Sequence, residues 1–349
     1  MTHTRLLFCF GGRSSEHEVS VRSATEVLAA LDRTRFEPLL LALRRDGQWR
    51  TGAADTPLSE VLQNGRVVHD LHELAPDLVF PVLHGPYGED GTFQGMLEVL
   101  GLPYVGSGVL ASALCMDKAA QKHYLSAKTF SLPMVPWIEL HAAQIDDQSS
   151  DVARRVQTEL GYPCFVKPAN MGSSIGVSRV REPDGLDAAL RQACRFDSKL
   201  VVERGISARE IEVALLGNGG PETIVSAPGE IGLPPGEWYD YDTKYLHDAA
   251  TLHVPAVLPT NVAERARELA LTAFRAVDCT GFARVDFLVD ANTFDVYLNE
   301  INTIPGFTPV SMYPKLMEHA GIPYRDLISR LCELALAYHE TRVKLSVQR

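Results

Sequence analysis

Short apolar runs and stretches of helical periodicity alternate over the first hundred residues of the chain. The runs at 6–10, 38–43 and 78–83 predict buried strands, and the spacing of apolar residues at 18–31 and 92–100 predicts helices. Strands that alternate with helices in this order form a parallel sheet covered by those helices. The pattern therefore predicts an α/β fold.

The rest of the chain predicts helices and strands in a less regular order, with a linker at 132–136. Helices are expected near the carboxy terminus and at 118–128, 151–160, 185–194 and 262–277, and strands at 163–167, 200–203 and 210–216. A long loop rich in Gly, Pro and Tyr is expected at 229–248, and such loops are more often lids than passive connections. We predict domains at 1–117, 118–208 and 209–349, with α+β order in the central one and a lid at 232–248.

A polar hairpin in the last domain carries the strongest chemical signal. Strands are expected at 284–290 and 294–302, joined by a turn at 290–292. Because side chains alternate along a strand, the polar faces are expected to contain Arg284, Asp286 and Leu288 on the first strand and Leu298, Glu300 and Asn302 on the second. Carboxylate and amide oxygens are ligands for Mg²⁺, so the hairpin predicts a metal site. The alternative is a solvated hairpin face with incidental charges.

Composition and charge limit the class of protein. With 349 residues, of which 46% are hydrophobic and 22% charged, the chain resembles a multidomain globular enzyme. The net charge of -11 argues against nucleic-acid binding. The apolar run at 6–10 is too short for a signal peptide or a membrane span, and the six cysteines include no Cys-x-x-Cys pair. We therefore expect a cytoplasmic protein with reduced cysteines and no membrane partner.

The strand expected at 163–167 ends in a lysine, and a Gly/Ser loop follows it. Glycines let the backbone N–H groups of a tight loop, here 172–176, point toward phosphate oxygens, and Lys167 adds a mobile positive charge. Neither a Walker A motif nor a dinucleotide motif is present. A loop of this kind alone is more often an ordinary turn, but Lys118 and the polar hairpin favour phosphate binding. Glu203 and Glu210, taken alone, are best explained as surface charges.

Two further loops are expected at the carboxyl ends of the parallel strands, where ligands of open α/β sheets bind. Glu16 follows the first strand and either caps the first helix or accepts a substrate ammonium group. His84 follows the third strand and is equally well a ligand contact or a packing residue. The stretch 239–245 combines aromatic and charged side chains, as expected of a lid.

Taken together, these motifs resemble those of the D-alanine–D-alanine ligase family of the ATP-grasp superfamily, over almost the whole chain. The motifs that carry the resemblance lie at 11–20, 84–91, 116–118, 166–168, 172–174, 241–245, 284–286 and 299–306. The resemblance implies an ATP-grasp fold preceded by a Rossmann-like parallel-sheet domain, with ATP between the central and last domains. A local departure is Ile304 with Phe307 around the Pro305-Gly306 turn.

The resemblance also implies roles for individual residues. ATP would be bound by Lys118, Lys167, Ser174, Glu203, Ile206, Glu210 and Lys244. Two Mg²⁺ ions, or Mn²⁺, would be held by Asp286, Glu300 and Asn302. The catalytic residues would be Glu16, Ser173, Tyr245, Arg284 and Ser311. The substrates would contact Glu16, His84, Arg284, Gly306, Ser311 and the backbone at Met312.

The activity implied is the ATP-dependent joining of two D-alanines through an acyl phosphate, for peptidoglycan precursor synthesis, by a homodimer. Tyr245 favours a D-amino acid as second substrate, because ligases that accept D-lactate carry a histidine there. D-Serine stays open, since an apolar pocket discriminates poorly against one hydroxyl. The alternatives are another ATP-grasp carboxylate–amine ligase and a regulatory nucleotide-binding protein. His84 and Tyr245 are the candidates for the base that deprotonates the second amine.

Overall fold

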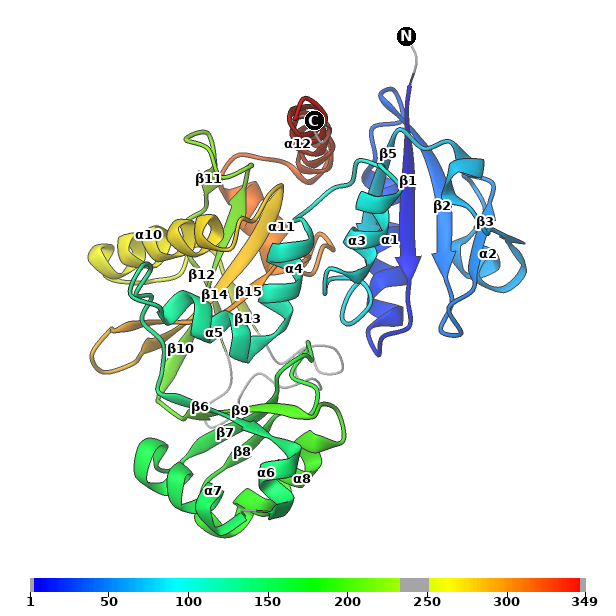
Figure 1. The fold of residues 1–349 in the computed structure, drawn as a ribbon. Coiled ribbons are helices and arrows are strands. Elements are labelled where there is room, and N and C mark those ends of the chain that lie inside the picture. The colour runs from blue at the N-terminus through cyan, green and yellow to red at the C-terminus, as the bar shows by residue number, and fades with distance from the viewer. Residues whose placement is uncertain (1–2, 148, 233–250, 346–349) are drawn as a thin grey trace.

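A computed structural model of the chain describes residues 3–147, 149–232 and 251–345. Within these residues the strands form three sheets, each packed against helices (Figure 1). The first sheet uses residues 4–82, the second 137–204 and the third 208–302. The cysteines are free thiols, all of them buried except Cys194, as expected of reduced core residues.

The first sheet is parallel at its centre and has the strand order β4-β3-β2-β1-β5. Its strands are β1 (Thr4–Gly11), β2 (Phe36–Leu43), β3 (Trp49–Gly52), β4 (Arg66–Val67) and β5 (Leu78–Val82). β1 pairs in parallel with β2 and with β5, which confirms the predicted arrangement. β3 and β4 add antiparallel strands at one edge, and the sequence pattern did not reveal them.

Helices cover both faces of the first sheet because its strands are apolar on both sides. Even-numbered residues of β1, such as Phe8, pack with helices α1 (His17–Ala30), α2 (Leu58–Asn64) and α12 (Tyr324–Val343). Odd-numbered residues, such as Cys9, pack with the 3₁₀ helix η1 (Leu71–Leu74) and with α3 (Thr92–Val99). The period of two along the strand thus divides the core of this sheet into two layers.

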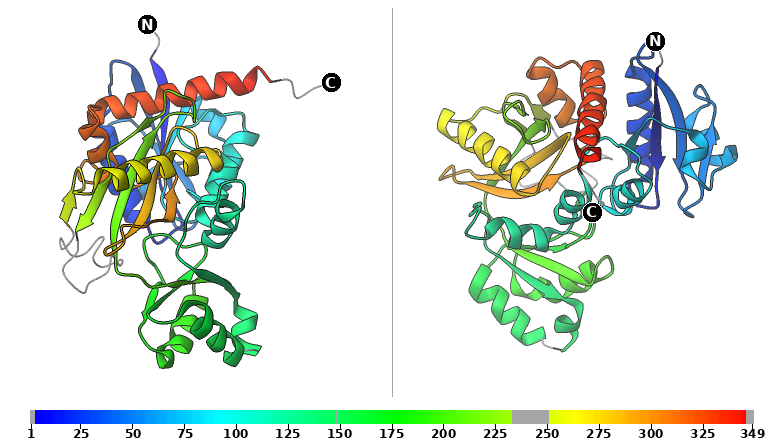
Figure 2. Two further views of the ribbon diagram at one scale, coloured as in Figure 1. Left: turned by 90° about the vertical axis from the view of Figure 1, so that its left-hand side faces the viewer. Right: turned by 45° about the horizontal axis from the view of Figure 1, so that its top comes forward.

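Helix α12 joins the first sheet to the third. It contacts α1 and β5 on one side and α11 (Met312–His319) on the other, and Figure 2 shows it between the two sheets. Two ion pairs support the contact with the first sheet: Arg325 to Asp32 at 2.9 Å and Arg35 to Glu333 at 2.6 Å. The carboxy-terminal helix therefore completes the core of the amino-terminal sheet.

The second sheet is antiparallel and has the order β6-β9-β7-β8. Its strands are β6 (Trp137–His141), β7 (Cys164–Pro168), β8 (Ser178–Val180) and β9 (Lys199–Arg204). Its helices are α6 (Ala142–Asp147), α7 (Ser149–Arg155), the π-helical turn η2 (Val156–Leu160), the 3₁₀ turn η3 (Pro183–Gly185) and α8 (Leu186–Cys194). The helix predicted at 151–160 is thus α7 followed by one π turn, and β6 was not predicted.

The third sheet has the order β13-β12-β10-β14-β15, with β11 paired to β10. Its strands are β10 (Ala208–Leu216), β11 (Ile224–Val225), β12 (Gly229–Gly232), β13 (Thr251–His253), β14 (Phe282–Asp290) and β15 (Val296–Asn302). Helix α10 (Thr260–Ala276) packs on one face with α4 (Val109–Met116) and α5 (Lys118–Ser126), and α11 packs on the other. The loop predicted from 229 is wrong in its first four residues, because they form β12, and its remainder lies outside the described residues.

A β-bulge changes the predicted pattern of the hairpin. Asp286 pairs with Glu300, but Phe287 pairs with Leu298, so Asn299 is an extra residue on β15. Leu298 lies with Phe287 in the core beneath the sheet. The prediction that Leu298 shares the polar face of its strand is therefore wrong, since the bulge reverses the alternation at this point. The second strand also begins at Val296 rather than at 294.

Candidate active site

Polar side chains replace apolar ones on one face of the third sheet. The register places Glu212 of β10 opposite Asp286 of β14, and Asp286 opposite Glu300 of β15. The adjacent row pairs Arg284 with Asn302. Residues that pair across neighbouring strands point to the same side. Three carboxylates, a guanidinium and an amide therefore share one small area.

Arg284 neutralises part of this row. Its guanidinium donates two hydrogen bonds of 2.7 Å to the carboxylate of Asp286, and its Nε lies 3.0 Å from Glu212 Oε2. Asn302 Nδ2 donates a further hydrogen bond of 2.9 Å to Asp286 Oδ2. Burial alone would lower the pKa of Arg284, but the charges of Asp286 and Glu212 raise it well above its ordinary value. Arg284 is therefore permanently charged.

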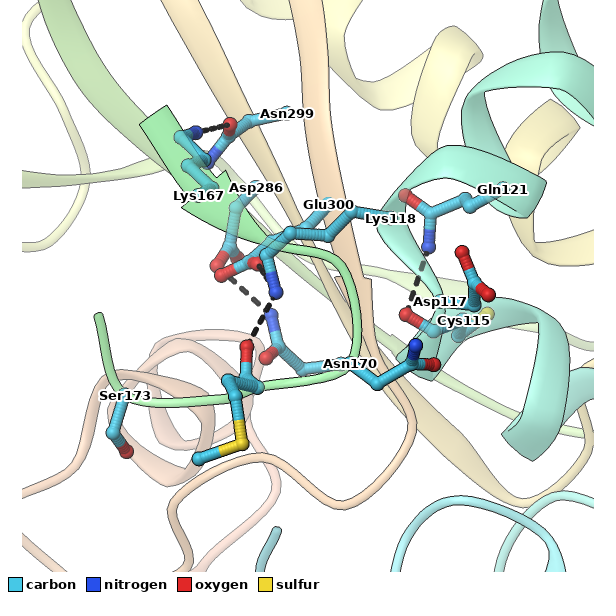
Figure 3. A network of polar contacts seen from close by, with 12 residues as sticks. Cys115, Asp117, Lys118, Gln121, Lys167, Asn170, Ser173, Asp286, Asn299 and Glu300 are labelled. Atoms are coloured by element: carbon cyan, nitrogen blue, oxygen red, sulfur yellow. Dashed lines mark hydrogen bonds and ion pairs between the residues drawn. The ribbon is translucent and has the colours of Figure 1, made fainter. Parts of the chain in front are cut away.

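Lys118 reaches the same face from the start of helix α5. Its Nζ donates a hydrogen bond of 2.6 Å to Met171 O and lies 3.7 Å from Glu300 Oε2 (Figure 3). The preceding residue, Asp117, caps the helix by accepting from the N–H groups of Ala119 and Ala120 at 3.1 and 3.0 Å. The cap fixes the helix start and hence the direction of the lysine.

Lys167 reaches the face from strand β7 of the second sheet. Its Nζ lies 2.7 Å from Glu203 Oε2. It also donates a hydrogen bond of 3.4 Å to Asn299 Oδ1 (Figure 3). Burial would lower the pKa of Lys167, but Glu203 outweighs it and the pKa is raised. Glu203 is itself buried and forms a second ion pair, of 2.8 Å, with Lys122 Nζ. The extra residue of the bulge, Asn299, thus faces a lysine rather than the core.

A cavity of about 530 Å³ lies between the second and third sheets. Its volume is within the range of sites for small molecules and cofactors. The predicted site residues that line it are Lys118, Lys167, Ser173, Ser174, Glu203, Ile206, Glu210, Arg284, Asp286 and Glu300. The structure thus brings most of the predicted nucleotide and metal residues to one cavity, which isolated surface charges would not do.

The Gly/Ser loop connects this cavity to Glu16 of the first sheet. Ser173 Oγ donates a hydrogen bond to Glu16 Oε1, and a side chain at Gly172 would come within 3.0 Å of Glu16 Oε2. Ser173 and Ser174 both adopt left-handed φ angles, of 52° and 58°. Such angles are strained for residues other than glycine and are characteristic of binding loops. The predicted contact between Glu16 and Ser173 is present, while their roles stay predictions.

Glu16 lies in an acidic, buried corner. It is 5% exposed, and its Oε2 has no hydrogen-bond partner among the described residues. Glu89 lies in the loop after β5, and its carboxylate accepts a 3.0 Å hydrogen bond from the N–H of Gly85. Burial and the neighbouring Glu16 raise the pKa of Glu89 to about 8. A buried carboxylate oxygen without a donor suits a ligand that brings its own N–H groups.

Both ring nitrogens of His84 contact protein atoms. Its Nδ1 lies 3.2 Å from Ile304 O, and its Nε2 lies 3.3 Å from Ser23 Oγ. A carbonyl oxygen only accepts, so Nδ1 carries the proton and Nε2 accepts from the serine hydroxyl. Burial lowers the pKa of His84 despite the nearby Glu16 charge. The neutral ring therefore connects the first sheet to the loop after β15.

The remaining predicted residues lie near the start of helix α11. Thr308 and Ser311 share a hydrogen bond of 2.8 Å between their hydroxyls, and a side chain at Gly306 would come within 3.3 Å of Ser311 Oγ. The side chain of Met312 is buried in the core, and the predicted contact of its backbone with substrate stays a prediction. Lys244 and Tyr245 lie outside the described residues, as does the predicted lid except for Gly232, which ends β12.

Four residues of the site escaped the sequence reasoning: Glu212, Lys122, Glu89 and Asn299. Glu212 had a signal, because it alternates with the apolar residues of β10 and shares the parity of Glu210. Lys122 had none, since a lysine in a polar helix is ordinarily exposed.

The donors of the hairpin fit a divalent cation, although no group of three or more His, Cys, Asp or Glu side chains among the described residues is arranged as a metal site. The candidate set is two carboxylates, Asp286 and Glu300, with the amide of Asn302. Both Asp286 oxygens already accept hydrogen bonds, but each carboxylate oxygen has a second lone pair. Carboxylate and amide oxygens are ligands that Mg²⁺ and Mn²⁺ take.

The cavity between the second and third sheets, lined by lysines and carboxylates, fits the ATP-grasp class of ligases. Family comparison agrees: residues 5–107 match the description "D-ala D-ala ligase N-terminus" and residues 127–333 match "D-ala D-ala ligase C-terminus". This chain therefore belongs to the D-alanine–D-alanine ligase family, whose members depend on ATP.

Individual relatives support the same assignment. The D-alanine–D-alanine ligase of Heliobacterium modesticaldum is 44% identical, with 100% of this chain and 99% of the relative covered. That of Deinococcus radiodurans is 47% identical over 95% of this chain and 98% of the relative. Among solved structures, the D-alanine–D-alanine ligase of Coxiella burnetii has a TM-score of 0.85 and 34% identity, with 99% and 97% covered. The VanG D-Ala:D-Ser ligase of Enterococcus faecalis has a TM-score of 0.82 and 32% identity, with 96% and 100% covered.

The described residues include no helix that is both long and apolar enough to cross a membrane.

Proposed function

We propose that this chain joins two D-alanines into D-alanyl-D-alanine, with ATP converted to ADP and phosphate, for the synthesis of peptidoglycan precursors. The observation that carries the proposal is the loop 172–174. One side of this loop lines the cavity with its lysines and carboxylates, and Ser173 on the same loop is hydrogen-bonded to the buried Glu16. A site for a phosphorylated nucleotide thus adjoins a site for an ammonium group.

The charge of each site residue indicates which part of the substrates it binds. Lys118 and Lys167 bind the phosphates of ATP, the backbone at Ile206 and the carboxylate of Glu203 contact adenine, and Glu210 contacts the ribose. Glu16 binds the ammonium group of the first D-alanine, which directs the carboxylate of that molecule toward the cavity. Asp286, Glu300 and Asn302 would hold two Mg²⁺ or Mn²⁺ ions, which would neutralise phosphate charge when bound.

The reaction needs an activated acyl group. A carboxylate oxygen of the first D-alanine attacks the γ-phosphorus, the bond to ADP breaks, and an acyl phosphate results. The amine of the second D-alanine then attacks the acyl carbon, phosphate leaves with the bonding electrons, and the amine gives up a proton. Arg284 supplies fixed positive charge where negative charge develops, and loss of one such donor typically costs about 3 to 4 kcal/mol of barrier. Ser311 and the backbone at Met312 receive the second D-alanine.

The test is phosphate release from ATP and Mg²⁺ with and without D-alanine, followed by mass spectrometric identification of the product. We expect D-alanine-dependent phosphate and one dipeptide. ATP consumption without any D-alanine dependence would contradict the proposal. Likeness to a D-Ala:D-Ser ligase makes D-serine the second candidate for the second substrate, so separate reactions contain D-alanine with D-serine or with D-lactate.

We also propose the domains 1–117, 118–208 and 209–349, a homodimer and a cytoplasmic location. The three separate sheets support the domain division, as do the two cores that belong to the first and the second sheet alone. Light scattering of the purified protein tests the dimer.

A further inference from the structure

Lys122 is a buried lysine directly behind the wall of the cavity. It lies one helical turn after Lys118 on α5, so both side chains leave the same face of the helix. Lys118 lines the cavity, whereas Lys122 does not line it and is 1% exposed. Fully buried lysines are rare and are held by an opposite charge. Its partner is Glu203, at 2.8 Å from Nζ to Oε1.

Glu203 is bound from two sides. Its Oε1 lies against Lys122, and its Oε2 lies 2.7 Å from Lys167. Burial would raise the pKa of Glu203, but the two lysines outweigh it and hold the pKa at about 2. Burial also lowers the pKa of Lys122, although Glu203 opposes the effect. Glu203 is therefore an ionised carboxylate, fixed in position at the cavity wall.

Lys122 and Lys167 differ in the contacts that they make besides Glu203. Lys167 lines the cavity and also donates to Asn299, so it is within reach of a ligand. Lys122 has no access to the cavity and serves Glu203. When phosphates attract Lys167, Lys122 is the cation that stays with the Glu203 carboxylate. Without it, the carboxylate and the phosphates would compete for one lysine.

We propose that Lys122 is a positioning residue that holds Glu203 ionised and oriented, so that the cavity selects adenine over guanine. The proposal rests on the ATP-dependent function proposed above. An ionised carboxylate only accepts hydrogen bonds. Adenine offers an amino group at its position 6, whereas guanine offers a carbonyl oxygen there, which would face the carboxylate as a second acceptor. Sites built to pair with an N–H group reject analogues that lack it, because the buried group is left unpaired.

The test compares Lys122→Met and Lys122→Arg with wild type in the full-length protein. Phosphate release is measured with ATP or GTP as the varied nucleotide and D-alanine saturating. For Lys122→Met we expect the ratio of kcat/KM for ATP to that for GTP to fall by about tenfold or more, mainly through a higher KM for ATP. For Lys122→Arg, which keeps the charge, we expect most of the ratio to be retained.

Gln121→Leu is the matched control. Gln121 is the adjacent residue of α5, is 1% exposed and donates to Cys115 O at 3.2 Å (Figure 3). This variant also removes a buried polar group, and we expect it to lower stability without a change in the ATP to GTP ratio. An unchanged ratio in Lys122→Met, or an equal loss in Gln121→Leu, would overturn the proposal.

Two further measurements test the role of Lys122 if Lys122→Met does not fold or if wild type does not turn over D-alanine. If Lys122→Met does not fold, the double variant Lys122→Met with Glu203→Gln removes both charges, and we expect a folded protein that binds ATP and GTP with similar affinity in calorimetry. Retained preference for ATP in that variant would contradict the proposal. Calorimetry with nucleotide alone also separates the role of Lys122 from the proposed ligase function. If wild type did not turn over D-alanine, the proposed function would be rejected. A loss of preference for binding ATP over GTP in Lys122→Met would still support the role of Lys122.

Discussion

Replacement of Arg284 by lysine tests whether the carboxylate row depends on the shape of the guanidinium or only on its charge. Arg284 serves two carboxylates at once, with two hydrogen bonds to Asp286 and a 3.0 Å ion pair to Glu212. All three side chains are largely buried, with exposed fractions of 16%, 12% and 5%. A lysine ammonium group keeps the charge, but it cannot present two parallel N–H groups.

The expected loss of stability follows from these contacts. A lysine that keeps one of the three charged contacts loses two, and hydrogen bonds to charged groups are worth about 1.5 to 3 kcal/mol each. The retained positive charge still offsets part of the repulsion between the carboxylates. We therefore expect Arg284→Lys to lower the free energy of unfolding by about 3 kcal/mol, near the lower end of the additive range. Because we propose that Arg284 lies where negative charge develops, we expect kcat to fall by about 100-fold or more.

Urea unfolding monitored by circular dichroism measures the free energy, and phosphate release measures kcat. Arg154→Lys is the matched control, because Arg154 pairs with Asp151 at 3.2 Å on the surface, with side chains 71% and 62% exposed. Exposed pairs contribute little, so this variant should stay within about 0.5 kcal/mol of wild type. If Arg284→Lys changed stability no more than Arg154→Lys, charge alone would suffice and the argument from the planar guanidinium would be refuted.

Three other predictions concern single side chains. Glu300→Gln should abolish phosphate release while the circular dichroism spectrum stays that of wild type, and turnover near the wild-type rate would contradict the metal assignment. Because burial and Glu16 raise the pKa of Glu89 in the fold from 4.5 to about 8, the unfolded chain releases this proton first as the pH rises. Wild type should therefore lose stability relative to Glu89→Gln as the pH rises from about 4.5 to 8, by at most about 1.4 kcal/mol per pH unit. Urea midpoints of both proteins, measured across this range, test the prediction. If the two proteins showed the same pH dependence, the raised pKa of Glu89 would be excluded. Ser173→Ala removes the donor to Glu16 and should raise the KM for D-alanine more than the KM for ATP, so an effect on ATP alone would place the loop elsewhere.

Local pattern was enough to predict the elements that bury an apolar face. β1, α1, β5 and α10 were predicted within a few residues because their period and their bounding glycines and prolines are local properties. The pairing of Asp286 with Glu300 also follows from alternation along two adjacent strands.

The elements that were missed depend on partners distant in sequence. The bulge at Asn299 places Leu298 beneath the sheet with Phe287, and its only local signal is the pair of polar residues between the apolar Leu298 and Ile301. Lys122 on helix α5 is buried beside an opposite charge, Glu203, that comes from the distant strand β9. Short strands such as β6 carry a single period of alternation between polar and apolar residues, which is too little to separate them from a loop.

The position of helix α12 has a consequence for biosynthesis. Residues of α12, such as Leu331, pack in the same core as Phe8 of the first strand, so nearly the whole polypeptide separates two halves of one core. Ribosomes add about 5 to 20 residues per second, so the part of this face that α12 covers stays open for tens of seconds after the first sheet emerges, although α1 and α2 already cover the rest. During that interval its apolar face is open to chaperones, and the earliest segment to be made is among the last to be completed.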